Sequence, residues 1–253
     1  MTTKAASTPI DAARLVCSTV AAVLLLPVLL GLGAAASAAK IAVIGTGNVG
    51  QALGPEFAAQ GHTIVYGSRT PTEQDVKDLV AKTGHGATAT TQTEAVKGAD
   101  IVVLAVPGTA AEQVARSLGD LSGKIILDPT NRVDRSNPDG YADYGVPGTG
   151  SNAELVQAAQ PNARVVKAFN TLNVKQMVNP ETSGGALSIP IVGNDAAAKA
   201  VVAELIKGMG LEPIDLGPLR FARVLEEMLV IWANARGHGA AYNYYLRPEP
   251  KAN

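Results

Sequence analysis

Short apolar runs alternate with helix-like stretches along the chain from residue 40 onward. Several of the early runs consist almost entirely of Val, Ile and Leu, which favours parallel strands that are covered on both faces. The strand candidates are Ile41–Ile44, His62–Tyr66, Ile101–Ala105, Lys124–Leu127, Arg164–Ala168, Leu187–Val192 and Glu212–Leu216. Helical patterns lie between them at Gln51–Gln60, Ala110–Leu118 and Ala153–Ala159. This alternation predicts an α/β fold with a Rossmann-type doubly wound parallel sheet and a smaller C-terminal α/β domain.

Two features refine the middle of the chain. Ser151 and Glu154 have the spacing of a capping box, which predicts that a helix starts at Ser151. Before it, residues 132–150 are rich in Asn, Asp, Pro and Gly and form a loop longer than most. Such a loop is either a functional lid or a plain insertion, and the sequence favours neither.

An apolar stripe predicts a further helix near the C-terminus. Its spacing of i, i+4, i+7, i+11 is that of Phe221, Leu225, Met228 and Trp232, and it is widened by Val224, Leu229 and Ile231. We therefore expect this helix to be more buried than a one-sided surface helix. The aromatic segment 242–245 that follows would suit a contact between two copies of the chain, a homodimer, with core packing as an equal alternative.

The first 38 residues have the layout of a secretory signal peptide. No charged residue occurs from Leu15 to Ala39, Lys4 and Arg14 precede this run, and Ala36-Ser37-Ala38 supplies small residues for cleavage. We expect residues 1–38 to be removed, which implies an exported protein, periplasmic or secreted. The alternatives are a retained membrane anchor, which would make a membrane a partner, and a misassigned start codon of a cytoplasmic protein.

Charge and cysteine content exclude some functions. The chain has 253 residues, 21 Lys and Arg against 22 Asp and Glu, and a formal net charge of −1, so electrostatics gives no case for nucleic acid as a partner. A single cysteine, Cys17, excludes an intramolecular disulfide framework and any multi-cysteine metal site. The three histidines show no ligand spacing, and we expect His62 and His85 to lie on the surface.

A glycine motif follows the first strand directly. Residues 45–50 read Gly45-Thr46-Gly47-Asn48-Val49-Gly50, a G-x-G-x-x-G pattern between a strand and a helix, as in dinucleotide-binding βαβ units. Gly45 permits the tight turn, Gly47 lets the backbone approach a pyrophosphate, and Gly50 allows close packing of helix and strand. The N-terminus of the following helix offers free N–H groups and a positive dipole end to the phosphates.

The end of the second strand indicates which dinucleotide binds. An NAD-selective site usually has Asp or Glu there, and none occurs between Ile64 and Thr72. Ser68 and Arg69 instead offer a hydroxyl and a planar cation, which suit the 2′-phosphate of NADP(H). The alternative for Arg69 is a solvated surface charge.

Further candidate cofactor contacts lie where later strands end, because ligands bind at the carboxyl edge of such sheets. Val106 and Pro107 would lie beside the adenosine or the linking phosphates. Ala168 ends another strand at the same edge. Asn131 and Asn170 could hydrogen-bond the nicotinamide ribose or carboxamide, and each could equally be a turn former.

These motifs resemble one family. Residues 45–50, Gly67-Ser68-Arg69, residues 103–107, and residues 216–219 followed by 223–226 look like NADPH-dependent coenzyme F420 reductases. The resemblance implies a Rossmann domain, a smaller C-terminal domain, and hydride transfer between NADP(H) and a deazaflavin. The nucleotide-binding domain of membrane ferric reductases has a similar pattern, so the match does not fix the acceptor. We place the NADP-binding domain at residues 39–172 and the smaller domain at residues 173–253.

The predicted function is therefore an NADP(H)-dependent oxidoreductase with a small-molecule redox acceptor, coenzyme F420 or a flavin. In such hydride transfer the cofactors carry the chemistry, so we expect neither a catalytic side chain nor a metal site. The alternative acceptors are a flavin, a quinone, a ferric chelate, or a small imine or ketone. A non-catalytic NADP-binding sensor module is the alternative from another class.

Overall fold

The computed structural model describes residues 38–148 and 150–249. The fold given below is that of the unit that begins at Ala36. Apart from Ala38, the predicted signal peptide lies outside the described residues. Within the described ranges, no helix has both the length and the apolar character that a membrane crossing needs.

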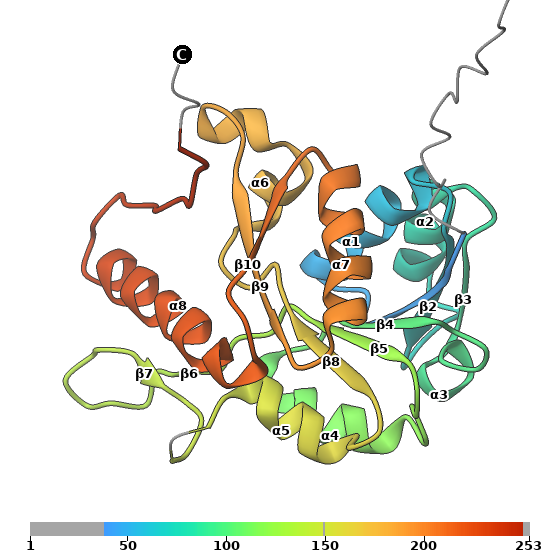
Figure 1. Cartoon of the computed structure of the whole chain (residues 1–253), viewed down its shortest axis with the longest axis horizontal. Helices are drawn as coiled ribbons and strands as arrows, with labels where there is room; N and C mark the ends of the chain where they lie inside the picture. The colour runs from blue at the N-terminus through green and yellow to red at the C-terminus, as the bar shows by residue number, and fades with distance from the viewer. Residues whose placement is uncertain (1–37, 149, 250–253) are drawn as a thin grey trace, which may run out of the picture. The chain divides into compact units, whose positions relative to one another are not determined.

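One sheet of eight strands, with order β10-β9-β8-β5-β4-β1-β2-β3, forms the centre of this unit (Figure 1). Its strands are β1 (Lys40–Ile44), β2 (Thr63–Ser68), β3 (Thr88–Thr91), β4 (Ile101–Leu104), β5 (Ile125–Asp128), β8 (Arg164–Lys167), β9 (Ser188–Gly193) and β10 (Glu212–Asp215). From β3 to β8 all pairs are parallel, and the order is the 3-2-1-4-5-6 order of dinucleotide-binding sheets. The predicted α/β, Rossmann-type doubly wound fold is confirmed.

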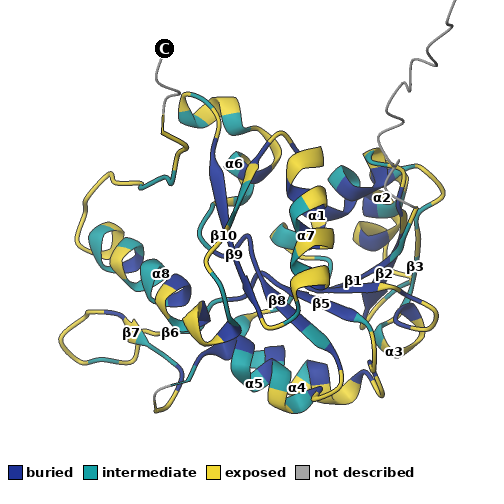
Figure 2. Ribbon diagram, in the orientation of Figure 1, coloured by how far each residue is buried: buried dark blue, intermediate teal, exposed yellow. Residues whose placement is uncertain are grey.

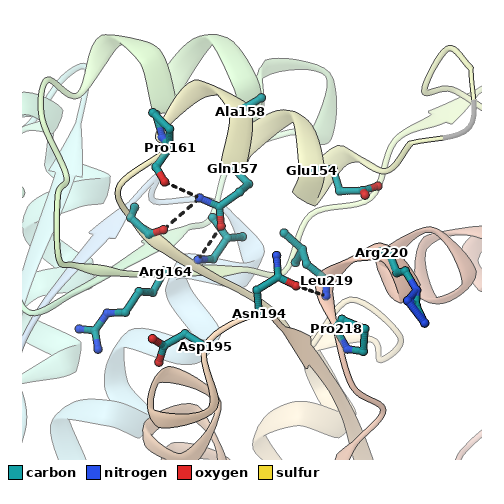
Figure 3. Close-up of a pocket in the computed structure, with 12 residues that line it drawn as sticks. Glu154, Gln157, Ala158, Pro161, Arg164, Asn194, Asp195, Pro218, Leu219 and Arg220 are labelled. Atoms are coloured by element: carbon teal, nitrogen blue, oxygen red, sulfur yellow. Dashed lines mark hydrogen bonds between the residues drawn. The ribbon is translucent and has the colours of Figure 1, made fainter.

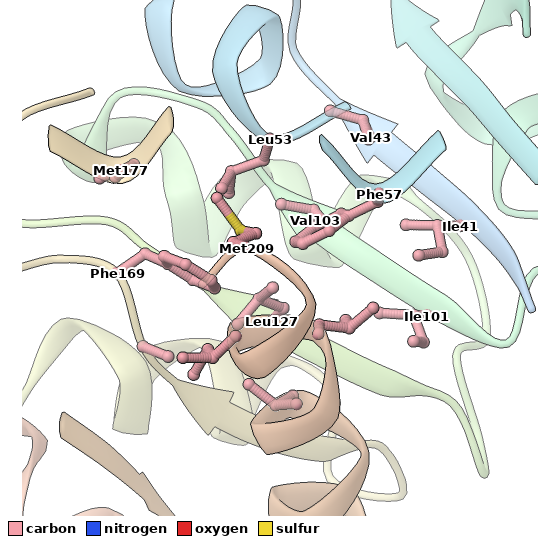
Figure 4. Close-up of a cluster of buried hydrophobic side chains, with 14 of the residues drawn as sticks. Ile41, Val43, Leu53, Phe57, Ile101, Val103, Leu127, Phe169, Met177 and Met209 are labelled. Carbon is pink, nitrogen blue, oxygen red and sulfur yellow. The ribbon is translucent and has the colours of Figure 1, made fainter. Parts of the chain in front are cut away.

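Helices cover both faces of the sheet, and alternate strand residues determine which helices each face meets. The helices are α1 (Asn48–Ala59), α2 (Gln74–Thr83), α3 (Gln92–Ala95), α4 (Gly108–Ser117), α5 (Asn152–Ala159), α6 (Val174–Val178), α7 (Ala196–Gly208) and α8 (Ala222–Gly237), with 3₁₀ turns η1 (Pro180–Ser183) and η2 (Leu219–Phe221). Ile41 and Val43 pack in one core cluster with α1, α2 and α7 (Figure 4). Ala42 and Ile44 pack in a second cluster with α3, α4, α5 and α8. The central strands are buried from both sides (Figure 2).

The last two strands extend the same sheet. β9 pairs antiparallel with β8, at Val166↔Gly193 and Lys167↔Val192, and β10 pairs parallel with β9. β10 contains Pro213 and lies at the edge of the sheet, where the missing N–H donor of proline is tolerated. The boundary at residue 172 between two domains stays a prediction, and β9 and β10 on its C-terminal side share the sheet of the N-terminal half.

Three local predictions need comment or correction. The segment 132–150 contains a short antiparallel hairpin, β6 (Val133–Asp134) and β7 (Asp143–Tyr144), where we expected only a loop. The C-terminal helix exists, but Val224 and Ile231 are each 59% exposed, so one of its faces meets solvent rather than core. His62 is buried, not on the surface. Burial of its ring is tolerated because Nδ1 accepts a hydrogen bond from the backbone N–H of Ala39, 3.1 Å away.

Candidate functional site

The glycine loop lies where the chain reverses its direction of winding across the sheet. It joins β1 to α1, and the next strand on the other side of β1 is β4. Gly45 has φ +108°, and a Cβ on it would lie 2.2 Å from the carbonyl oxygen of Ala105 after β4. A Cβ on Gly50 would lie 2.2 Å from the carbonyl oxygen of Gly45. These two glycines are therefore required by the loop's own packing.

Gly47 differs from them, because a Cβ there would meet no atom of the described residues within 4 Å. Its φ of −78° is one that any residue adopts. Gly47 is the exposed N-cap of α1, and the first turn of this helix has no acidic residue that would neutralise its positive dipole end. Thr46, Asn48 and Val49 complete the loop, and this cradle fits a pyrophosphate.

Ser68 and Arg69 stand at the end of β2, next to the glycine loop, since Gly45 N–H donates to the carbonyl of Gly67 over 3.0 Å. The Ser68 hydroxyl accepts a hydrogen bond from Thr70 N–H at 3.1 Å and keeps its own proton available for donation. Arg69 is exposed, so its guanidinium can reach a phosphate on the adenosine ribose. The arrangement fits the 2′-phosphate of NADP(H).

Val106 and Pro107 lead from β4 into α4, whose first residue approaches the end of β5 closely. A Cβ on Gly108 would lie 1.9 Å from the carbonyl oxygen of Asn131. Val106 also lies 3.3 Å from the Cβ position of Gly45, so the β4 segment contacts the glycine loop. The structure thus brings the predicted residues after β1, β4 and β5 to one edge of the sheet.

Asn131 and Asn170 pair with each other, although 39 positions separate them. The Asn131 amide donates to the Asn170 carbonyl at 2.8 Å, and the Asn170 amide donates to Asn131 Oδ1 and to the Leu225 carbonyl, both at 2.9 Å. Asn170 Oδ1 is buried and receives no hydrogen bond from the described residues, so an amide donor such as a carboxamide would complement it.

Ala168 and Phe169 precede Asn170 and are both fully buried in the first core cluster. The side chain of Ala168 therefore belongs to the core rather than to a ligand surface. Phe169 has φ +66°, in the left-handed region that bulky residues rarely adopt, and packs edge-to-face on Phe57 with ring centroids 6.3 Å apart. This strained backbone redirects the chain after β8, so that Asn170 turns toward Asn131.

A cavity of about 290 Å³ lies between the N-terminus of α1 and helix α8, at the carboxyl ends of β5 and β8. Its lining residues are Asn48, Val49, Pro129, Asn131, Phe169, Asn170, Thr171, Leu172, Asn173, Val174, Met177, Leu229, Trp232, Asn243, Tyr244 and Tyr245. None of these described residues carries a charge, and the polar groups are mainly asparagine amides and tyrosine hydroxyls. Burial, together with the neighbouring Tyr242, raises the pKa of Tyr244 to about 12, so its hydroxyl stays protonated at neutral pH.

Much of this lining could not be identified from the sequence. The sequence pattern assigned Trp232 to a helix stripe and residues 242–245 to a dimer contact or core, whereas Trp232, Asn243, Tyr244 and Tyr245 line the cavity. No sequence pattern indicated that the α6 residues Val174 and Met177 would line a cavity. Of the lining residues, only Asn48 and Val49 of the glycine loop and the strand-end residues Asn131 and Asn170 were among the predicted cofactor contacts.

Helix α8 is fixed beside the cavity by a buried ion network. Lys167 Nζ lies 2.9 Å from Asp128 Oδ2 and 2.7 Å from Glu226 Oε1, and all three side chains are fully buried. Glu226 also accepts hydrogen bonds from the N–H groups of Asn152 and Ala153 at the start of α5, at 2.9 and 3.2 Å. The capping box of Ser151 and Glu154 that starts this helix is confirmed. The network ties α8 to β5, β8 and α5.

The β6–β7 hairpin is held against α8. Tyr144 donates its hydroxyl to Glu226 Oε2 at 2.6 Å, and burial raises the pKa of Tyr144, with Glu226 acting in the same direction. Asn234 exchanges two hydrogen bonds with the backbone of Ala142, at 2.6 and 2.9 Å. The segment 132–150, for which the sequence left a lid and a plain insertion open, therefore has its hairpin packed on the helix that carries the cavity wall.

A larger hollow, of about 730 Å³, lies between α5 and the segments that follow β9 and β10 (Figure 3). None of the glycine-loop residues lines it. Its amides already bond within the protein: Gln157 Nε2 donates to three carbonyls, among them that of Pro161, and Asn194 Oδ1 accepts from Leu219 N–H. We therefore place the functional site at the smaller cavity.

Comparison with known proteins places the chain among NADP-dependent reductases. The pattern of the family described as NADP oxidoreductase, coenzyme F420-dependent, matches residues 40–132, which span β1 to the end of the Asn131 segment. The F420-dependent NADP reductase of Methanothermobacter thermautotrophicus is 29% identical over 219 residues, 82% of this chain and 94% of that protein. The metalloreductase STEAP3 of Rattus norvegicus is 28% identical over 189 residues, 75% of this chain. The chain spans only 36% of that metalloreductase's own length.

A solved structure extends the similarity across the fold. It is a protein from Arthrobacter sp. FB24 classed as an F420-dependent NADP reductase, 33% identical, with a TM-score of 0.74. The match covers 84% of this chain and all of that one. Because this match exceeds 30% identity over most of both chains, and the family pattern matches residues 40–132, the chain belongs to the family of F420-dependent NADP oxidoreductases.

Proposed function

We propose that the protein transfers hydride between NADPH and an acceptor with a flat heteroaromatic ring of the deazaflavin type, such as coenzyme F420. The single observation that carries the proposal is the cavity that adjoins the N-terminus of α1 and is lined by aromatic rings and amides. The open space at Gly47 and the exposed Arg69 support NADP(H) as the nucleotide.

When bound, NADPH supplies the hydride from C4 of its nicotinamide. The residues of this chain bind NADPH and the acceptor and orient them toward each other. The glycine loop and the N-terminus of α1 hold phosphates, and the Asn131–Asn170 pair presents amide groups at the strand ends. The aromatic and aliphatic residues of the cavity exclude water. The nicotinamide ring and the acceptor ring can then lie close together, and side reactions with water are suppressed.

The aromatic side chains of the described lining help to rank the alternative acceptors. A ferric chelate such as ferric citrate presents no flat ring that could stack on these side chains. A non-catalytic sensor needs no space for a second substrate, whereas the cavity adjoins the nucleotide end of the site. A flat ring with a hydrogen-bonding edge fits aromatic and amide surfaces best.

One observation favours a second candidate, the reduction of a small imine or ketone. Tyr244 remains protonated because burial raises its pKa to about 12, so its hydroxyl can donate to a carbonyl oxygen or an imine nitrogen in the cavity. This reaction would use the same nucleotide site with a smaller acceptor.

The test is anaerobic turnover of NADPH with coenzyme F420, FMN, ferric citrate and a cyclic imine, each followed by loss of NADPH absorbance. We expect turnover with F420, none with ferric citrate, and none with any acceptor in the Gly47→Val variant. Turnover with ferric citrate alone would contradict the proposal, and turnover with the imine alone would support the second candidate. Tight NADPH binding without any turnover would indicate a sensor.

A further inference from the structure

The C-terminal segment after α8 turns back across the molecule and ends beside β9 (Figure 1). At its far end, the carbonyl of Leu246 accepts a hydrogen bond from Ser188 N–H at 2.9 Å. The Arg247 guanidinium donates to the carbonyls of Ser183 and Ala186. Backbone and side-chain bonds thus anchor this segment, residues 240–249, to the start of β9 and to the turn before it.

The near end of the segment is joined to α8 at the cavity. Trp232 Nε1 donates to Asn243 Oδ1 at 3.1 Å, and both residues line the cavity. The Arg236 guanidinium lies 5.4 Å from the centroid of the Trp232 ring, a cation–π distance that helps to hold the indole in place. Between the two anchors, Tyr244 and Tyr245 line the cavity, and Tyr245 also packs against the first core cluster.

The segment and α8 therefore form one side of the cavity, and the start of α1 forms another. Asn48 and Val49 belong to the loop that binds the nucleotide, so the side that holds Trp232 and Tyr244 is left for the acceptor. Two large aromatic rings from different elements, with no charged neighbour in the described lining, offer stacking surfaces rather than ionic contacts.

We propose that Trp232 and Tyr244 form an aromatic slot that selects a planar acceptor ring, with the Trp232–Asn243 hydrogen bond holding the C-terminal segment in place as part of that slot. This inference rests on the proposed function, because it assigns the acceptor side of the same cavity. It makes the C-terminal segment a determinant of acceptor specificity.

The experiment measures the affinity of the NADP⁺-loaded, full-length protein for oxidised F420 and for FMN, by equilibrium dialysis. Stacking of an aromatic side chain on a planar base contributes about 1–3 kcal/mol, and about 1.4 kcal/mol is tenfold in affinity. Trp232→Leu and Tyr244→Leu should therefore each weaken binding of the acceptor about 5- to 150-fold. The affinity for NADP⁺, measured by titration calorimetry, should not change in either variant.

Two further variants separate stacking from a general structural effect. Trp232→Phe keeps an aromatic ring and should recover most of the acceptor affinity. Tyr141→Leu changes a tyrosine between β6 and β7 that is 50% exposed and does not line the cavity, so it should bind both ligands like the unmodified protein.

The proposal is overturned if Trp232→Leu and Tyr244→Leu bind the acceptor normally, or if they lose NADP⁺ and acceptor affinity to the same degree. It is also overturned if Tyr141→Leu shows the same loss as Tyr244→Leu. Normal turnover of F420 by the unmodified protein together with such results would leave the proposed function standing and remove only the slot. Failure of the unmodified protein to bind either F420 or FMN would remove both.

Discussion

In the glycine loop, the surroundings of a Cβ atom added to each glycine show which glycines the fold requires and which one a ligand would require. A Cβ at Gly45 or Gly50 would collide with backbone oxygens 2.2 Å away, so these two glycines are needed whether or not a ligand binds. Gly47 faces space that is free of described protein atoms. Its lack of a side chain therefore has no explanation in the packing of the protein and points to a ligand.

We expect Gly47→Val to abolish NADPH binding and to leave the fold largely intact, because the added carbons would occupy the space of the pyrophosphate. Titration calorimetry with NADPH and urea unfolding check the two halves of this expectation. Gly50→Val serves as the contrast and should lower the free energy of unfolding, because its side chain meets the backbone of Gly45. NADPH affinity that is unchanged in Gly47→Val would remove the loop from the site.

Arg69 should determine the preference for NADPH over NADH. Hydrogen bonds to charged groups contribute about 1.5–3 kcal/mol, and about 1.4 kcal/mol is tenfold in affinity, so Arg69→Ala should weaken NADPH binding roughly 10- to 150-fold. NADH lacks the 2′-phosphate, so its affinity should change little. The exposed Arg135 provides a control, since Arg135→Ala should affect neither ligand.

The affinities of Arg69→Ala for NADH and for NADPH together determine the role of Arg69. Equal weakening of NADH and NADPH would mean that the arginine supports the loop or the pyrophosphate. No change in either would make it a solvated surface charge. Ser68→Ala should act in the same direction as Arg69→Ala but more weakly, because a neutral hydroxyl is lost rather than a cation.

Candidate site residues could be selected from the sequence where the chemistry depends on neighbouring positions; their roles stay predictions. The glycine spacing and the Ser68–Arg69 pair lie within a few positions of a strand end, and the fold brings both to the same edge of the sheet. The Asn131–Asn170 pair joins residues 39 positions apart, and Glu226 reaches Lys167 from the last helix. No local pattern carries such information, because the contacts depend on strand order and on the docking of α8.

At the scale of elements, the buried network of Lys167 determines how α8 docks. Lys167→Met would leave the carboxylates of Asp128 and Glu226 buried without their cation. Removing one partner of a buried ion pair costs about 3–5 kcal/mol, so we expect a loss of that size in the free energy of unfolding, measured with urea at pH 7.

An exposed pair provides the matched control for this change. Lys207 and Glu204 lie 2.8 Å apart on α7, with more than half of each side chain exposed. Such pairs contribute about 0–1 kcal/mol, so Lys207→Met should change little. If Lys167→Met were no more destabilising than Lys207→Met, the network would not be what holds α8.

His62, at the start of β2, should make stability depend on pH. Burial lowers the pKa of His62 below its usual 6.5 in the folded protein, while the unfolded chain keeps the usual value. As the pH falls below about 6.5, the unfolded chain binds a proton that the folded protein resists, so stability is lost. Protonation of Nδ1 would also break the bond from Ala39 N–H.

Urea midpoints between pH 8 and pH 5 test this prediction. The unmodified protein should lose stability below about pH 6.5 more steeply than His62→Gln. His85 is exposed, so His85→Asn should keep the slope of the unmodified protein. Equal slopes for the unmodified protein and His62→Gln would show that His62 titrates alike in both states.

Strands that are rich in apolar residues were predicted from the sequence, whereas strands that lack an apolar run were missed. All seven predicted strands occur; six of them consist mostly of buried residues, and β10 is a partly exposed strand at the edge of the sheet. β3 was missed because its residues 88–91, Thr-Ala-Thr-Thr, carry no apolar run. The β6–β7 hairpin was missed because its strands have two residues each and are stabilised by contacts with α8 rather than by local pattern.

At the scale of the whole molecule, the periodicity of α8 predicted a helix but not its exposure. The apolar residues of α8 lie on two sides of the helix. Leu225 is buried against the core, whereas Phe221, Val224 and Ile231 are exposed. A one-dimensional pattern counts apolar residues without showing which partner covers each side. The exposed side of α8 is therefore a property of the assembled molecule, and the described chain does not cover it.

We propose that a second copy of the chain covers this face. Phe221, Val224, Met228 and Ile231 follow the three- and four-residue steps of a helix–helix seam, and Val224 and Ile231 are each 59% exposed. Such a stripe is self-complementary about a two-fold axis, which is the usual symmetry of a homodimer. The double variant Val224→Glu/Ile231→Glu places like charges in the seam, so we expect it to sediment as a monomer where the unmodified protein sediments as a dimer. Val201, 41% exposed on α7, provides the control, because Val201→Glu should leave the mass in solution unchanged. Sedimentation of the unmodified protein as a monomer, or of the double variant as a dimer, would rule out this interface.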